Sequence, residues 1–364
     1  MDSKTFLYDY LNAFAPVGQE TPGQRVWIDY VKNFSDKVHL DSYGTAYAVL
    51  RGNTAGQDLS HRFAAPYKVV IEAHCDEIAW IITQIEKDGY VRVKRAGGSD
   101  NMIAASKSVI IHTHTRKQVK AVFGSPAVHV RDKYTEMGPE QHELWLDLGV
   151  DSDEKVKELG VEVGCMVTFD DQFSELGDYY VGRSLDNKIG GYIIAETLRR
   201  IKESVHLLPF DLYVVNSVQE EVGLFGARRI AKTIGADIAL VHDVCHNTNH
   251  PKMNKAKDGD IQGGKGPCVE FTAQNHRQII ELYRETAKDF DIPLQLTVGS
   301  YGNDTVSFFL ENTPTAILAT PLKYMHTTVE MAHKEDVESA IQLFYHTLLN
   351  LDTHFIERIN NPII

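Results

Sequence analysis

From Ser184 onward, segments with helical spacing alternate with short apolar segments. The helical patterns cover residues 186–201, 224–233, 277–290 and 335–351, and the strand patterns cover 212–218, 237–243, 267–272, 293–297 and 314–318. Alternation of this kind is typical of a mainly parallel sheet with helices on both faces. We therefore expect an α/β fold built on a mainly parallel mixed sheet.

The first part of the chain extends this pattern, and a middle part interrupts it. Helical patterns at 5–14 and 21–31 precede a hairpin pattern at 38–51 and an apolar strand at 67–73. Between residues 78 and 170, short alternating strand patterns dominate, at 80–85, 90–94, 108–113 and 118–123, with one helical candidate at 152–159. A chain of 364 residues is also longer than one core usually supports. We predict a catalytic domain of residues 1–77 and 171–364, with a small β domain inserted at 78–170.

Composition excludes several classes of partner. The net charge of −13 argues against nucleic acid, whose binding proteins present a basic surface. No stretch approaches the roughly 20 apolar residues of a membrane helix, and the N-terminal residues lack the apolar region of a signal peptide. The four cysteines are far apart and form no C-x-x-C motif. These features predict a cytoplasmic protein with neither nucleic acid nor a membrane as partner.

Acids and histidines lie at the ends of several predicted strands or at strand-to-helix junctions. They are His74 and Asp76, Asp186, Glu220 and Glu221, Asp243, and His326. The carboxyl ends of parallel strands converge on one crevice. So many carboxylates can share a pocket only if cations neutralise them. Five His and carboxylate ligands fit two zinc-like metals bridged by one carboxylate, an arrangement used by aminopeptidases.

Seven motifs in order give the chain a resemblance to a known family. They are A-H-C-D-E-I-A at 73–79, G-R-S-L-D-N-K at 182–188, Q-E-E-V-G-L-F-G-A at 219–227, H-D-V-C-H-N-T at 242–248, G-K-G-P at 264–267, Y-G-N-D-T at 301–305 and P-L-K-Y-M-H-T-T-V-E at 321–330. Together they resemble the dinuclear-metal aminopeptidases that assemble into tetrahedral particles. That family includes the glutamyl aminopeptidases and the so-called cellulase M proteins.

The resemblance implies a role for each site residue. His74, Glu221, Asp243 and His326 would bind two divalent metals, with Asp186 bridging them. Glu220 would be the general base, and Asp76 would orient His74. The spacing alone does not show which of the adjacent Glu220 and Glu221 is the base and which is the metal ligand. Zinc is the favoured metal, with cobalt or manganese as alternatives. The β domain would serve dimerisation and access, with dimers assembling into a homo-oligomer of twelve subunits.

For several residues near these motifs, we favour a structural role over a role in the site. His112 and His114 alternate on a predicted strand and lack an evident third ligand. Cys75 is expected to be a buried, inert thiol. Residues 263–266 superficially resemble a phosphate loop but lack its spacing. His246 and His250 follow Asp243 closely; we favour loop positions without a role for them, with contact to the site or substrate as the alternative. The motif at 301–304 departs from the family's more common Gly-Gly-Thr-Asp.

Three functions remain open from the sequence. The leading prediction is an aminopeptidase that removes N-terminal residues from peptide substrates with a metal-activated water. A glycoside hydrolase is the second, prompted by the cellulase label within the family; such enzymes use two carboxylates and normally no metal. The third is a self-assembling, peptide-binding particle without catalytic activity. Loss of activity with a chelator and recovery with metal would disfavour the glycosidase.

Overall fold

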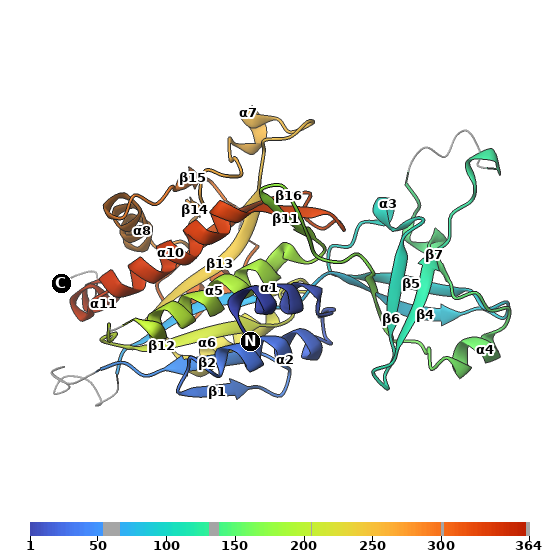
Figure 1. The fold of residues 1–364 in the computed structure, drawn as a ribbon, viewed down its shortest axis with the longest axis horizontal. Helices are drawn as coiled ribbons and strands as arrows, with labels where there is room; N and C mark the ends of the chain where they lie inside the picture. The colour runs from blue at the N-terminus through green and yellow to red at the C-terminus, as the bar shows by residue number, and fades with distance from the viewer. Residues whose placement is uncertain (54–65, 131–137, 205, 300–301, 362–364) are drawn as a thin grey trace.

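Four neighbouring parallel strands form the centre of a large mixed sheet (Figure 1). The computed structural model describes residues 1–53, 66–130, 138–204, 206–299 and 302–361. The central strands are β12 (Asp211–Ser217), β3 (Lys68–His74), β13 (Ile238–His246) and β16 (Thr315–Lys323). Their carboxyl ends therefore lie at the same edge of the sheet.

Antiparallel strands flank this parallel centre. On one side are β2 (Ala46–Leu50) and β1 (Lys37–Leu40); on the other are β17 (Glu330–His333), β11 (Tyr179–Gly182) and β10 (Ser174–Leu176). A short strand, β14 (Cys268–Glu270), pairs antiparallel with β16 and parallel with β15 (Gln295–Thr297). The α/β class and the hairpin at 38–51 are confirmed. The antiparallel edge formed by β10, β11 and β17 was not predicted.

Helices cover both faces of the sheet, as the alternation predicts. One face packs against α1 (Ser3–Asn12), α2 (Thr21–Val31), α5 (Leu185–Glu203), α8 (Arg277–Asp289) and α10 (Lys334–Asn350). The other packs against α6 (Phe225–Ile234) and α9 (Thr305–Leu310). The remaining helices of this part are α7 (Lys255–Asp258) and α11 (Thr353–Asn360). Within β3, Val69 and Ile71 contact the first set and Val70 the second, because side chains alternate along a strand.

The segment between β3 and β10 forms a closed six-stranded barrel (Figure 1). Its strands, in spatial order, are β4 (Ala79–Ile85), β5 (Val91–Ala96), β8 (Trp145–Asp147), β7 (Gln118–Phe123), β6 (Ser108–His112) and β9 (Met166–Phe169). It has its own core, which includes Trp80 and Phe123. The predicted small β domain is therefore present as a barrel. Besides the expected helix, α4 (Asp153–Glu158), it contains α3 (Asn101–Ala104), which is too short to give a helical pattern.

A buried ion cluster lies where the chain passes between the sheet and the barrel. Glu77 follows β3 and contacts Arg183 and Lys188, which lie on either side of Asp186. All three side chains are almost completely buried. The Glu77 carboxylate also accepts a hydrogen bond of 2.7 Å from the backbone amide of Ala15. This cluster fixes the segment that delivers Asp186 relative to the end of β3.

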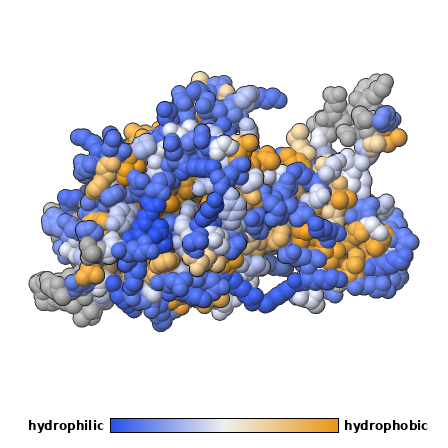
Figure 2. Space-filling model, in the orientation of Figure 1, coloured by the Kyte–Doolittle hydropathy of each residue, from blue (hydrophilic) through white to orange (hydrophobic). Residues whose placement is uncertain are grey.

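Most of the surface seen in Figure 2 is hydrophilic, with apolar residues gathered on the barrel and near its junction with the larger part. None of the helices described by the structure is long and apolar enough to cross a membrane.

Candidate metal centre

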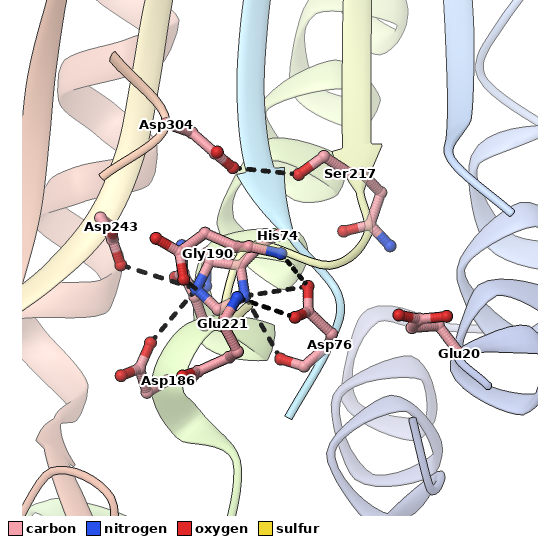
Figure 3. Close-up of polar contacts among 12 residues, drawn as sticks. Glu20, His74, Asp76, Asp186, Gly190, Ser217, Glu221, Asp243 and Asp304 are labelled. Atoms are coloured by element: carbon pink, nitrogen blue, oxygen red, sulfur yellow. Dashed lines mark hydrogen bonds and ion pairs between the residues drawn. The ribbon is translucent and has the colours of Figure 1, made fainter. Parts of the chain in front are cut away.

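His74, at the end of β3, is surrounded by carboxylates (Figure 3). Its Nε2 atom lies 3.3 Å from Oδ1 of Asp186 and 3.9 Å from Oδ1 of Asp243. Asp186 lies in the first turn of α5, and Asp243 lies within β13, which continues past the predicted strand end to His246. One ligand atom from each of these three residues falls within a group less than 4.8 Å across.

A second group of potential ligands shares Asp186 with the first. The other carboxylate oxygen of Asp186, Oδ2, lies 3.3 Å from Nε2 of His326. The same His326 nitrogen lies 3.4 Å from Oε1 of Glu221. Asp186 therefore presents one oxygen to each imidazole, which is how a carboxylate bridges two metal ions. All five residues predicted as ligands converge at this edge of the sheet.

Asp76 contacts both His74 and the loop that follows β12. Its backbone oxygen lies 3.2 Å from Nδ1 of His74, and its Oδ1 lies 3.5 Å from the same nitrogen. The carboxylate accepts hydrogen bonds from the backbone amides of Glu220, at 3.0 Å, and Glu221, at 3.1 Å. Asp76 thus holds the Glu220–Glu221 loop in addition to meeting His74.

Glu330, to which the sequence analysis gave no role, holds two other ligands. It begins β17 and is 2 % exposed. Its carboxylate accepts hydrogen bonds from the backbone amides of His326, at 2.7 Å, and Asp186, at 3.1 Å. It ends the motif 321–330, and its pairing with Gly182 on β11, together with the pairing of β17 with β16, places it beside Asp186. Its position in that motif, shortly after His326, was the available sequence signal.

Burial and neighbouring charges shift the pKa values of the residues at the centre. Burial, together with Asp304 and Asp243, raises the pKa of Glu220 to about 10, although His74 opposes this. Burial also raises the pKa of Asp243. Asp186 and Glu221 raise the pKa of His326 to about 11. Imidazole nitrogens and carboxylate oxygens at these separations are the donor set that zinc and related divalent metals accept, so the residues fit a metal centre.

The inserted barrel also contributes to the site. Gly98 follows β5, and a Cβ atom built on it would lie 2.5 Å from Nδ1 of His326. A Cβ built on Gly97 would lie 3.2 Å from Cβ of Glu221. Only glycine allows the barrel loop to approach His326 this closely.

A cleft of about 740 Å³ opens over the metal centre, and His246 lines it. The ring of His250 instead packs against Tyr324, 5.2 Å away. The ring of His112 forms a hydrogen bond of 2.8 Å with the hydroxyl of Thr168 and packs against Phe14. Burial raises the pKa of Cys75 to about 12, which fits an inert thiol.

Two remaining motifs have structural outcomes of their own. The amides of Gly264 and Gly266 donate to the buried carboxylate of Asp336, at 2.8 and 2.7 Å, so the phosphate-like loop 263–266 binds an acid of its own chain. Of the motif 301–304, Tyr301 lies outside the described residues, whereas Asp304 accepts a hydrogen bond of 3.1 Å from Ser217.

Comparison with known proteins agrees with this geometry. The model of the M42 glutamyl aminopeptidase family matches residues 59–343. The chain belongs to this family. Lysyl aminopeptidase of Pyrococcus furiosus is 28 % identical over 323 residues, covering 87 % of this chain and 88 % of that protein. The family resemblance inferred from the seven motifs is therefore confirmed.

Solved structures of M42-like aminopeptidases share the fold. An aminopeptidase from the archaeon Desulfurococcus kamchatkensis superposes with a TM-score of 0.89 and 27 % identity, covering 98 % of both chains. The Pyrococcus horikoshii TET1 peptidase, described as assembling into a tetrahedron or a large octahedral shell, has a TM-score of 0.82 and 26 % identity, covering 96 % of this chain and 100 % of that one.

Proposed function

We propose that this member of the M42 family is a metal-dependent aminopeptidase that removes N-terminal residues from peptides. Family membership supports aminopeptidase activity. One observation supports the metal-dependent mechanism most directly: Asp186 directs its two oxygens toward two different histidines, each of which has a further carboxylate partner.

The ligand roles follow from the two groups. His74 and Asp243 would hold one divalent metal, Glu221 and His326 the other, and Asp186 both. When bound, the two ions supply polarisation of the scissile carbonyl and a lowered pKa for the attacking water. Zinc is the metal we favour, with cobalt or manganese as alternatives, because all accept these ligands.

Glu220 is the residue we assign as general base. It lines the cleft, and its Oε2 lies 3.9 Å from Nε2 of His74, so it faces the first group of ligands. Its carboxylate is not part of either ligand group among the described residues. Bound cations favour the ionised form of a neighbouring carboxylate, so Glu220 can take a proton from the attacking water and pass it to the leaving amine.

The test uses purified protein stripped with a chelator and reloaded with zinc, cobalt or manganese. Hydrolysis of a panel of aminoacyl-p-nitroanilides should be lost on stripping and recovered on reloading. Cleavage of cellulose oligosaccharides that survives the chelator would instead favour a glycoside hydrolase. A fully loaded protein without activity on any of the panel would favour the peptide-binding particle.

We also propose that the chain works as a homo-oligomer in the cytoplasm. Its similarity to the P. horikoshii TET1 peptidase, which is described as a dodecamer and as assembling into a tetrahedron or a large octahedral shell, supports an assembly of dimers into twelve subunits. The inserted domain, residues 78–170, is our candidate for dimerisation and access, because it carries apolar surface (Figure 2) and reaches the site through Gly98. Mass measurement of the purified particle tests the subunit number.

A further inference from the structure

The cleft continues from the metal centre to an acid that has no role in metal binding. Asp243 on β13 pairs with Ala319 on β16, which in turn pairs with Cys268 on β14. Because side chains alternate along strands, Glu270 lies on the same face as Cys268. The strip of sheet between Asp243 and Glu270 is apolar; Cys245, Ile261 and Ile317 line the cleft there, with Cys268 and Ala319 buried among them.

Glu270 is a buried acid, and the described residues leave part of its carboxylate without a partner. Its side chain lines the cleft, and the residue is only 5 % exposed. Its Oε2 atom has no hydrogen-bond partner within the part of the chain that the structure describes. Burial alone raises the pKa of this carboxyl to about 7. An unpaired buried carboxylate is costly, and a ligand that supplies a cation removes that cost.

The backbone beside Glu270 is shaped around its carboxylate. A Cβ atom built on Gly299 would lie 1.6 Å from Oε2 of Glu270, so any other residue at position 299 would displace the acid. The side-chain amide of Asn275 donates a hydrogen bond of 2.8 Å to the backbone carbonyl oxygen of Glu270. Gly299 therefore leaves room for the carboxylate of Glu270 at the wall of the cleft.

The other charges lining the cleft do not neutralise Glu270. Asp258, which is exposed, adds negative charge to the cleft lining. Arg228 is the one lysine or arginine among the described residues that line the cleft. It is exposed and lies on α6, which packs on β12 and α9, whereas β14 lies beyond β16 on the other side of β13.

We propose that Glu270 recognises the positively charged side chain of a lysine or arginine at the N-terminus of the substrate. This inference rests on the proposed aminopeptidase function. β14 is two strands away from β13, a separation of about 10 Å. A substrate whose scissile carbonyl lies at the metal centre can extend a long side chain along the apolar strip, with its charged end at Glu270.

The same acid could instead hold the free α-amino group, which every peptide substrate carries. That role requires an acid close to the scissile carbonyl, whereas Glu270 lies across β16 from Asp243. The two roles give different results. Removing an acid that binds the α-amino group lowers the hydrolysis of all substrates equally. Removing an acid that binds the side chain lowers the hydrolysis of substrates with a cationic side chain only.

The test compares wild type with Glu270→Gln, which keeps the shape of the side chain and removes its charge. Substrates are the p-nitroanilides of lysine, arginine and norleucine, the last being a lysine analogue without the amine. The ratio of kcat/KM for lysine or arginine to that for norleucine should fall about 10- to 100-fold, as expected for loss of a hydrogen bond between charged groups. Asp258→Asn is the matched control, and its ratio should stay within about 3-fold of wild type.

Three results would overturn the proposal: an unchanged ratio in Glu270→Gln, an equal loss on all three substrates, or an equal fall of the ratio in Asp258→Asn. Calorimetric binding of free L-lysine and L-norleucine to the metal-loaded protein gives a second readout. The preference for lysine should disappear in Glu270→Gln. If wild type hydrolyses none of the substrates, the proposed function fails, and the binding preference still decides the role of Glu270.

Discussion

The backbone amide of Glu220 donates a hydrogen bond of 3.0 Å to the carboxylate of Asp76. This bond links the segment after β3 to the loop after β12, two places 144 residues apart in sequence. Because Asp76 also holds the next amide, it fixes the directions in which Glu220 and Glu221 leave the backbone. Adjacent residues can then take different roles, one in the proton transfer and one as a metal ligand.

Replacing Glu220 with Gln should separate these roles. We expect Glu220→Gln to keep its metal while turnover falls about 10²- to 10⁴-fold, the range for loss of general acid–base catalysis. The neighbouring Glu221→Gln is the matched comparison, and it should lose metal instead. Metal content by elemental analysis and kcat measure the two effects. Full activity in Glu220→Gln would show that another group moves the proton.

Asp76→Asn should weaken metal binding through the loop. The Asn side chain keeps one acceptor oxygen but turns an NH₂ group toward the second backbone amide, so one of the two bonds is lost. We expect metal affinity to fall about 10- to 100-fold, as is typical when a group supporting metal ligands is changed. Competition with a chromogenic chelator measures it. Asp88→Asn, in an exposed turn of the barrel, is the control, and equal affinities in both variants would argue against this role.

Glu330→Gln should have a comparable effect on the other side of the centre. The carboxylate of Glu330 accepts hydrogen bonds from the backbone amides of Asp186 and His326, and a Gln side chain can accept only one of these bonds. Since Asp186 belongs to both ligand groups, binding of both metals should weaken by about 10- to 100-fold. Titration of stripped protein with cobalt, followed by its absorption, reports each site. If both sites retained wild-type affinity, Glu330 would have no part in holding them.

Glu77→Gln tests the buried ion cluster near the junction. Burial alone would raise the pKa of Glu77, but Arg183 and Lys188 outweigh it and lower the pKa to about 2. Removing this acid leaves two buried cations without their partner, which should cost about 3–5 kcal/mol at pH 7. Denaturant unfolding of wild type and variant measures the difference.

The same pair of proteins gives a pH dependence. Because the folded-state pKa of Glu77 is lowered from 4.5 to about 2, its ionised form stabilises the fold above about pH 4.5. A shift of this size corresponds to about 3 kcal/mol. That contribution is lost as the pH falls toward 2, so the gap between wild type and Glu77→Gln should narrow over this range. A gap that stays constant from pH 7 to pH 3 would contradict the assignment.

Much of the centre could be predicted because its ligands follow strands with strong apolar patterns. His74 and Asp243 lie on β3 and β13, and His326 follows β16; these three strands are parallel neighbours, so their carboxyl ends meet. The adjacent acids Glu220 and Glu221 follow β12, so they lie at the same edge of the sheet for the same reason. The order of Glu220 and Glu221 came from the family resemblance, since spacing does not distinguish two neighbouring carboxylates.

Other parts of the site depend on contacts that no local pattern encodes. Glu330 reaches Asp186 because β17 turns back along β16 and pairs with β11, and Gly98 reaches His326 because the barrel loop approaches the cleft. The sequence by itself determined the α/β class, the inserted β segment and the group of candidate acids and histidines, because periodicity and strand ends are local properties. The tertiary structure decided which carboxylate faces both histidines, and it leaves Oε2 of Glu270 without a hydrogen-bond partner among the described residues. Those properties depend on distances between segments far apart in the chain.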